Sequence, residues 1–395
     1  KILLIIDDYL PYSTKVGAKM MHELAVHLKE IGHKITVLTP NPDQKSNLKI
    51  EILDEIKILY FKSGRIKNIG KIQRAINETL LSYKAFKYSK KYLIKNPHDG
   101  IIYYSPSIFF GNLVGKLINL WGCKSYLILR DIFPQWVVDN GLISKNSIIH
   151  YYFKYFEKVN YKHANFIGVM SGSNLNFFKE NGFDIKKFEI LYNWSKNIKV
   201  PKPKNKFRKQ LNLINKTVLF YGGNIGYAQQ IINLINLAKK FKNNTRVHFL
   251  FVGKGDEVNL LLESISKNNL NNITYLSSVN QKTYFEMLSE FDIGLFSLHS
   301  SHKTYNFPGK LLGYMSYSKP ILGCVNSGND LADIINKSKA GFVVNTLDEL
   351  ALYKSANRLI SSVHLREEMG NNGKDLLKSK FSVSVIAKQI MDKFI

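Results

Sequence analysis

The chain has 395 residues, 45% of them hydrophobic, which is enough for two or three globular domains of ordinary size. Lys and Arg number 56 against 30 Asp and Glu, a formal net charge of +26, so we expect an anionic partner: a nucleotide, a nucleic acid or a membrane surface. No apolar run approaches the ~18 residues that a membrane-crossing helix needs. The two cysteines lack metal-type spacing, so we expect free thiols in the cytoplasm.

The N-terminal residues predict a strand, a helix and a second strand. Residues 1–6 are an almost unbroken apolar run, typical of a strand buried on both faces, and residues 7–11 interrupt it. Apolar residues recur at helical spacing over 16–31, and the next strand begins at 35–38. Gly17 lies at the strand-to-helix turn of this βαβ unit, where glycine lets a phosphate approach the backbone. A tight turn without a ligand explains Gly17 equally well.

A basic segment lies between residues 62 and 95. It holds ten basic residues and a single acid, Glu78, interleaved with isoleucine, leucine and aromatic residues. Such a helix can rest on anionic lipid headgroups, and a solvated lysine-rich face is an equally good explanation. Tyrosines near 151–156 could touch a lipid or belong to the core or an interface.

A polar pair follows the strand predicted at 125–129. Arg130 and Asp131 stand where that strand ends, and ligands of α/β proteins bind at the carboxyl ends of strands. Asp131 is therefore a candidate for binding a ligand through its carboxylate. Arg130 could keep that carboxylate ionised or contact a phosphate. A structural ion pair or a helix cap remains the alternative.

The second half repeats the plan of the first. The charged, proline-interrupted residues 196–206 predict a linker. A strand at 217–221, a glycine turn at 222–226 and a helix over 231–241 follow it, and the next strand occupies 247–252. Each half therefore predicts its own doubly wound sheet.

Two further features of the second half are a loop and a terminal helix. Residues 307–312 run directly into an apolar helix, with Lys310 one residue past Gly309. A final helix with apolar residues at helical spacing is predicted over roughly 374–394.

Four segments together carry a family resemblance. The chain resembles retaining glycosyltransferases of family 4, and most closely the WbuB-like branch that assembles O-antigen and capsule. The resemblance keeps its order over essentially the whole chain. The four segments are residues 7–11 with 16–20, residues 129–136, residues 221–229 and residues 306–315.

The resemblance implies an α/β protein of GT-B architecture, with two Rossmann-like doubly wound domains facing a central cleft. Residues 1–197 would bind the acceptor and residues 198–373 the nucleotide diphosphate sugar, with residues 374–395 a helix that crosses back to the first domain. Relatives need no metal ion or other cofactor, and the chain contains no Asp-x-Asp triplet of the kind that holds a cation.

The resemblance also assigns site residues. Arg130 and Asp131 would be catalytic, facing the transferred sugar. The residues expected to bind the donor and its diphosphate are Gly17, Gly223, Asn224, Gly226, Lys254, Asn306, Phe307, Pro308, Gly309, Lys310, Leu311 and Leu312.

The chain departs from the common family pattern at three positions. Asn224 and Gln229 stand where relatives have an Arg and a Lys, and Gly313 stands where relatives have a ribose-binding Glu. Charge on the leaving diphosphate must then be stabilised by other cations, for which Lys310 and Lys254 are the candidates.

These features predict a retaining, metal-independent transferase acting at the inner face of the cytoplasmic membrane. The expected donor is a UDP sugar, such as N-acetyl-L-fucosamine or another 6-deoxy-amino sugar, and the expected acceptor is an undecaprenyl-diphosphate-linked saccharide. The predicted partners include an anionic membrane surface and exclude nucleic acid, since no zinc-finger, RRM or helix-turn-helix pattern is found. A nucleotide-sugar epimerase, a nucleic-acid binder and a catalytically silent carbohydrate-binding scaffold are the alternatives.

Overall fold

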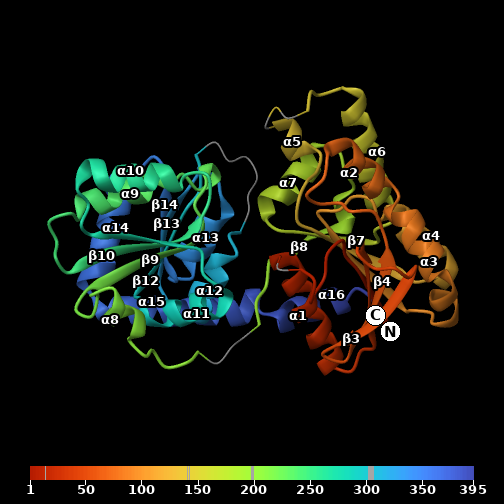
Figure 1. Cartoon of the computed structure of the whole chain (residues 1–395), viewed down its shortest axis with the longest axis horizontal. Helices are drawn as coiled ribbons and strands as arrows, with labels where there is room; N and C mark the ends of the chain where they lie inside the picture. The colour runs from red at the N-terminus through yellow and green to blue at the C-terminus, as the bar shows by residue number, and fades with distance from the viewer. Residues whose placement is uncertain (14, 140, 142, 197–199, 301–306) are drawn as a thin grey trace. The chain divides into compact units, whose positions relative to one another are not determined.

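The computed structural model describes residues 1–13, 15–139, 141, 143–196, 200–300 and 307–395 (Figure 1). The chain divides into two compact units. Unit 1 consists of residues 1–192 and 383–395, and unit 2 consists of residues 193–382. The sequence expectation placed the boundary at 197/198 and grouped 374–395 together, whereas the structure divides that terminal segment between the two units.

Unit 1 is a parallel sheet with helices, extended by one antiparallel edge strand. Its strand order is β3-β4-β2-β1-β5-β6-β7-β8, and only the pairing of β3 with β4 is antiparallel among the described strands. Its strands are β1 (Ile2–Ile5), β2 (Ile35–Asn41), β3 (Leu48–Leu53), β4 (Ile56–Lys62), β5 (Gly100–Ser105), β6 (Lys124–Leu129), β7 (Phe166–Val169) and β8 (Phe188–Ile190). Its helices are α1 (Val16–Glu30), α2 (Lys71–Thr79), α3 (Leu81–Lys95), α4 (Gly111–Trp121), α5 (Gln135–Asp139), α6 (Ile148–Lys162), α7 (Gly172–Glu180), the 3-10 turn η1 (Ile185–Lys187) and α16 (Val383–Met391).

Unit 2 is a second doubly wound α/β unit. Its described strands are all parallel, in the order β11-β10-β9-β12-β13-β14. They are β9 (Thr217–Asn224), β10 (Val247–Lys254), β11 (Ile273–Ser277), β12 (Ile293–Ser297), β13 (Ile321–Val325) and β14 (Gly341–Asn345). The helices are α8 (Lys206–Gln210), η2 (Tyr227–Gln229), α9 (Ile232–Lys240), α10 (Val258–Asn268), α11 (Gln281–Glu290), α12 (Lys310–Ser316), α13 (Asp330–Lys337), α14 (Glu349–Ser361), α15 (Val363–Leu376) and the π-helical η3 (Leu377–Phe381). The predicted pair of Rossmann-like domains is confirmed.

Apolar strands explain why both sheets are parallel and buried. Every residue of β1 is buried, as is every residue of β5 and of β12. Strands that are apolar on both sides need cover on both faces, which the helices between parallel strands supply. The carboxyl ends of the central strands therefore gather at one edge of each sheet, where loops can carry function.

Strand β9 is longer than predicted. The sequence placed its end at Tyr221, but β9 continues through Gly222 and Gly223 to Asn224, all paired with β10. A Cβ on Gly253 of β10 would lie 1.8 Å from the carbonyl oxygen of Gly223, so glycine is required for this close pairing. The predicted glycine turn at 222–226 is wrong in its first part, because these glycines extend the sheet, and α9 begins only at Ile232.

The single terminal helix predicted over 374–394 is also wrong. The chain passes from α15 into η3, and Ser382 adopts an extended conformation before α16 begins. Ser382 forms a β-bridge with Ser195, which interrupts the helix. Helix α16 then packs on α1 of unit 1.

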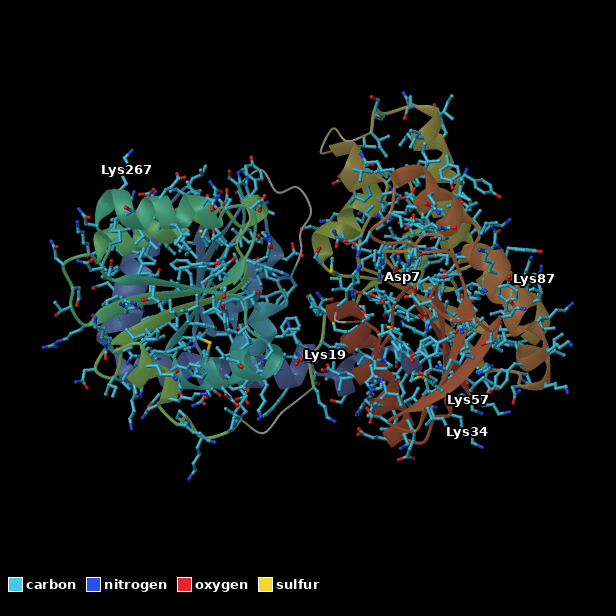
Figure 2. All side chains as sticks on the ribbon, in the orientation of Figure 1. Asp7, Lys19, Lys34, Lys57, Lys87 and Lys267 are labelled. Atoms are coloured by element: carbon cyan, nitrogen blue, oxygen red, sulfur yellow. The ribbon has the colours of Figure 1, made fainter. Side chains whose placement is uncertain are left out.

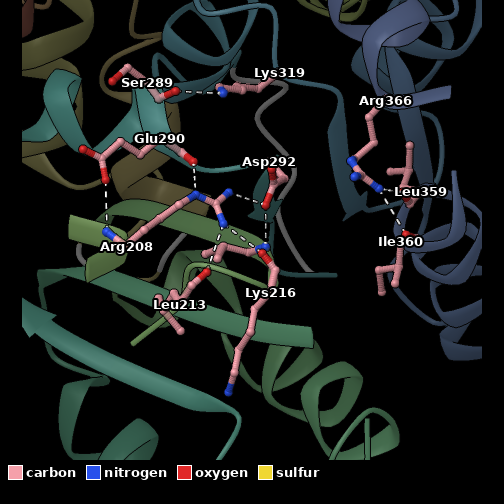
Figure 3. Close-up of polar contacts among 11 residues, drawn as sticks. Arg208, Leu213, Lys216, Ser289, Glu290, Asp292, Lys319, Leu359, Ile360 and Arg366 are labelled. Carbon is pink, nitrogen blue, oxygen red and sulfur yellow. Dashed lines mark hydrogen bonds and ion pairs between the residues drawn. The ribbon is translucent and has the colours of Figure 1, made fainter. Parts of the chain in front are cut away.

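A cluster of charged side chains fastens α8 to the end of α11 within unit 2 (Figure 3). The Glu290 carboxylate accepts hydrogen bonds from the amides of Lys206, Phe207 and Arg208 at 2.8, 2.9 and 3.0 Å. The Arg208 guanidinium donates to the Glu290 carbonyl oxygen and to Asp292, both at 2.7 Å. The first helix of unit 2 is thereby anchored to the end of α11.

Within the described part of the chain, no helix combines the length and the apolar character needed to span a bilayer.

Candidate functional site

The centre of the candidate site is the side chain of Lys310. Its Nζ lies 3.5 Å from the ring centroid of Tyr221, and a Cβ on Gly223 would lie 3.5 Å from the same atom. This ammonium nitrogen is buried and has no hydrogen-bond partner among the described residues. Burial lowers the pKa of Lys310 to about 7. Because a buried cation without hydrogen bonds is costly, an anionic ligand would complete this arrangement.

Helix α12 and strand β9 hold this lysine in place. Buried Tyr314 of α12 donates its hydroxyl to the carbonyl oxygen of Leu295 at 2.9 Å, and the amide of Gly222 donates to that hydroxyl at 3.4 Å. Leu311 and Leu312 are buried in the core. The helix that begins with Lys310 is thus fixed against the end of β9, so the ammonium has little freedom to leave its position over Tyr221.

The end of β9 forms the exposed side of the site. Gly223 has a φ of 131°, which an L side chain rarely adopts. The Asn224 side-chain amide donates to Gln229 Oε1 at 2.8 Å, so these two uncharged side chains bond to each other. A Cβ on Gly226 would lie 2.5 Å from Asp256 Oδ1, so a larger residue here would displace that side chain. The turn therefore exposes Gly223 and Asn224 beside the buried ammonium.

Two polar residues that the sequence did not single out also border the site. Glu257 donates its amide to the Ile225 carbonyl oxygen at 3.0 Å, and its Oε2 is buried without a partner among the described residues. Asn193 donates its side-chain amide to the Phe307 carbonyl oxygen at 3.4 Å, and its Oδ1 is equally unpartnered within that part of the chain. Their sequence signals are weak: Glu257 follows a strand-end loop, and Asn193 lies beside the linker.

The other predicted donor residues differ in what their side chains do. Lys254 is the exposed last residue of β10, and its carbonyl oxygen accepts from the Ile225 amide at 2.9 Å. Phe307 is buried, with its ring 4.6 Å from that of Phe381. Pro308 and Gly309 lead directly into α12. Asn306 lies outside the described residues.

The predicted catalytic pair and Gly17 belong to unit 1. Arg130 is buried and donates to the carbonyl oxygens of Leu191 and Tyr192 at 2.8 and 3.2 Å. Burial lowers the pKa of Arg130 to about 10. Burial raises the pKa of Asp131, and the opposing charge of Arg130 does not cancel the rise. The charge of Arg130 opposes the effect of burial and favours the ionised form of this carboxyl.

Tyr104 joins these residues at the carboxyl edge of the unit 1 sheet. A Cβ on Gly17 would lie 2.9 Å from the Tyr104 hydroxyl oxygen. Burial raises the pKa of Tyr104 to about 12; the charges of Asp131 and Asp7 add to the rise, and that of Arg130 opposes it. Unit 1 thus brings Gly17 and Asp131 to the same tyrosine, while the remaining described donor residues gather in unit 2.

A pocket of about 530 Å³ opens beside this edge of unit 1, at the ends of β1, β2 and β4. Asp7 and Asp8 line it together with Tyr12, Tyr60 and Lys67. Lys67 forms an ion pair with Asp8 at 2.5 Å, and burial raises the pKa of Asp7. Carboxylates beside an exposed tyrosine offer both hydrogen bonds and an apolar surface, a combination that suits a saccharide.

Among the described residues, no group of three or more His, Cys, Asp or Glu side chains is placed to hold a metal ion.

Comparison with solved structures identifies the fold. Sucrose-phosphate synthase from Thermosynechococcus elongatus superposes with a TM-score of 0.72 at 15% identity, covering 100% of this chain and 98% of that one. HepE of Anabaena, solved in complex with UDP, gives a TM-score of 0.71 at 15% identity over 100% of this chain and 99% of its own. The protein has the GT-B fold.

A family model matches the part of the chain that contains Lys310. Residues 203–376, which lie within unit 2, match the family "Glycosyl transferases group 1". The probable glycosyltransferase WbjE of Pseudomonas aeruginosa is 25% identical over 238 residues, 58% of each chain. The capsular polysaccharide biosynthesis glycosyltransferase CapM of Staphylococcus aureus is 24% identical over 230 residues, 55% of this chain and 53% of CapM. These matches span little more than half the length of either relative.

Proposed function

We propose that this protein is a retaining, metal-independent glycosyltransferase of bacterial surface polysaccharide synthesis. It moves a sugar from a nucleotide diphosphate donor, UDP in the first instance, to an undecaprenyl-diphosphate-linked saccharide at the inner face of the cytoplasmic membrane. The WbuB-like resemblance favours N-acetyl-L-fucosamine or a related 6-deoxy-amino sugar. The names of WbjE and CapM, and the UDP complex of HepE, agree with this class of reaction.

The observation that carries the proposal is the unpartnered ammonium of Lys310 in a group 1 domain. A diphosphate beside Gly223 would give this ammonium its counter-charge. During transfer, negative charge builds up on the leaving diphosphate, and a cation fixed in a dry site stabilises that charge strongly. Lys310 would thus supply the electrostatic stabilisation for which relatives use the Arg and Lys replaced here by Asn224 and Gln229.

The remaining steps follow from retention of configuration. The acceptor hydroxyl would attack on the face that the diphosphate leaves, and the departing phosphate oxygen would take the hydroxyl proton, so that one glycosidic bond forms as the sugar–phosphate bond breaks. Asp131 is proposed to orient the acceptor hydroxyl. Its raised pKa suits a carboxyl that forms hydrogen bonds to a sugar without acting as a strong base.

The test is a thermal-shift panel of UDP, GDP, dTDP and CDP with EDTA present. A ligand that binds only the folded protein adds about 2.7 kcal/mol of stability at 100 times its Kd. We expect one nucleotide, UDP, to raise the unfolding midpoint of the wild type and to have no effect on Lys310→Met. The matched control is Lys319→Met. Lys319 is half-buried and donates to the Ser289 carbonyl oxygen at 3.2 Å, so its loss should lower the unfolding midpoint without ligand and leave the UDP shift intact (Figure 3). If no nucleotide shifts the wild type, the scaffold alternative replaces this proposal.

A further inference from the structure

Helix α2 is an amphipathic helix that lies on the surface without a buried face. None of its residues, all of which the structure describes, is buried. Its isoleucines point outward: Ile72 is 80% exposed and Ile76 is 56% exposed. An isolated nine-residue helix with exposed isoleucines is marginal in water, and contact with another apolar phase would stabilise it.

The exposed apolar stripe continues from α2 into α3. Positions 72, 76, 80 and 83 follow one another at helical spacing, and Leu80 and Tyr83 are exposed as well. Residues three or four apart lie on the same side of a helix. The stripe therefore extends over the outer side of both helices.

Helix α6 adds a second exposed apolar stripe beside the first. The Tyr152 hydroxyl of α6 forms a hydrogen bond with the Thr79 hydroxyl at the end of α2, so the two helices touch (Figure 1). Ile148, Tyr151 and Tyr155 share one side of α6, and Ile148 is 88% exposed. We call these exposed residues of α2, α3 and α6 the apolar ridge. Its members are Ile72, Ile76, Leu80, Tyr83, Ile148, Tyr151 and Tyr155.

Basic side chains flank the apolar ridge. Residues 62–95 contain ten basic residues and one acid, and that acid, Glu78, already bonds to Arg74 at 2.9 Å. Lys87 lies on the outer side of α3 (Figure 2), with its Nζ 5.5 Å from the ring centroid of Tyr83. On α6, Glu157 bonds to Lys154 at 2.7 Å, while Lys158 remains exposed. The surface around the ridge is therefore strongly positive.

We infer that the apolar ridge is a membrane-docking surface that binds bilayers rich in anionic lipids. Isoleucine and tyrosine side chains would enter the boundary between headgroups and acyl chains, and the surrounding lysines would contact lipid phosphates. Charge complementarity decides between occupants: a second copy of this chain would bring an equally basic ridge, and the two would repel. The inference rests on the membrane location in the proposed function and deepens it by naming the surface that docks. Binding to vesicles requires no nucleotide, so this inference and the donor site can fail separately.

The test is co-sedimentation of the whole chain with phosphatidylcholine vesicles that contain or lack phosphatidylglycerol. We expect binding to the anionic vesicles only, weakened by salt, and at least a tenfold loss of affinity in the double variant Ile72→Glu/Ile148→Glu. The matched control is Leu347→Glu/Leu350→Glu in unit 2, where Leu347 is 80% exposed, as Ile72 is. This control should bind as the wild type does.

A second pair of variants separates the contribution of charge to vesicle binding from that of apolar contact. Lys84→Gln/Lys87→Gln should weaken binding to anionic vesicles, whereas Lys267→Gln/Lys282→Gln, on α10 and α11, should have little effect. All variants should keep the UDP shift of the wild type, which shows that they fold and separates this inference from the proposed function. Equal binding of the ridge variant and the wild type would overturn the inference. So would wild-type binding to neutral vesicles alone, or a dimer that the ridge variant dissociates.

Discussion

At the scale of single residues, the buried ammonium of Lys310 makes a prediction about pH. Its pKa of about 7 in the folded protein lies below the ordinary lysine value of 10.5, so the unfolded chain binds more protons between these limits. Stability rises with pH wherever the unfolded state binds more protons, by at most about 1.4 kcal/mol per pH unit for one group. From pH 7 to 9 the free energy of unfolding of the ligand-free wild type should therefore rise relative to that of Lys310→Met. Urea denaturation of both proteins at several pH values measures this difference. A difference that stays constant with pH would show that Lys310 remains charged in the free protein.

The same residue predicts that a nucleotide brings a proton with it. At pH 8 the free Lys310 is mostly neutral, and a diphosphate in contact would favour its charged form. Calorimetry of UDP binding in buffers of different ionisation enthalpy should show uptake of close to one proton in the wild type. Lys310→Arg stays charged throughout and should bind with no uptake. Equal uptake by both proteins would place the titrating group elsewhere.

Sequence pattern could predict Lys310 as a site residue, but not Glu257 and Asn193, which border the same site. The place of Lys310 one residue past Gly309 suggested a cation at a helix start, and the structure places it there. The unpartnered oxygens of Glu257 and Asn193 could not be predicted, because lack of a hydrogen bond is a property of three-dimensional surroundings and has no local signal. Arg130 shows the reverse: its strand-end position resembled that of a functional residue, yet its guanidinium bonds to backbone carbonyls that lie far away in sequence.

At the scale of elements, Glu290 should prove essential to the start of unit 2. Its carboxylate accepts from the first amides of α8, which an uncapped helix would leave unsatisfied. Glu290→Ala should lower the free energy of unfolding by about 3 kcal/mol, since hydrogen bonds to buried charged groups are costly to lose. Chemical denaturation measures the change, and Glu263→Ala, an exposed glutamate of α10, should alter it little. A loss no larger than that of Glu263→Ala would mean that water satisfies these amides.

Hydrophobic period predicted the strands and helices at the starts of both units, and its two errors share a physical origin. Strand β9 extends past Tyr221 because its glycines pair closely with β10. The spacing of apolar residues along one segment does not show which strand it pairs with. The predicted last helix divides at Ser382 because Ser195 pairs with it, again a contact between distant residues. The spacing of apolar residues therefore predicts where a helix or strand lies, whereas the residue at which it ends depends on tertiary contacts.

At the scale of the whole molecule, the return of α16 to unit 1 predicts how the two units respond to a mutation. Ile390 of α16 is fully buried, so Ile390→Ala should cost unit 1 about 3 kcal/mol through the cavity that it leaves. Hydrogen exchange should then speed up in β1 and α1 but not in β9 and β10, and the UDP shift should persist. Ile395→Ala, at a residue that is 93% exposed, is the control and should change neither unit. Faster exchange in both units together would show that they unfold as one.

The return of α16 to unit 1 also affects when each unit can complete its folding during synthesis. Unit 2 is an insertion: residues 193–382 leave the ribosome before the segment 383–395 that completes unit 1. Nascent unit 1 must therefore wait, with the α1 surface that α16 covers still open, while the whole of unit 2 is translated and folds. Chaperone contact during synthesis would then be directed mainly at the half made first.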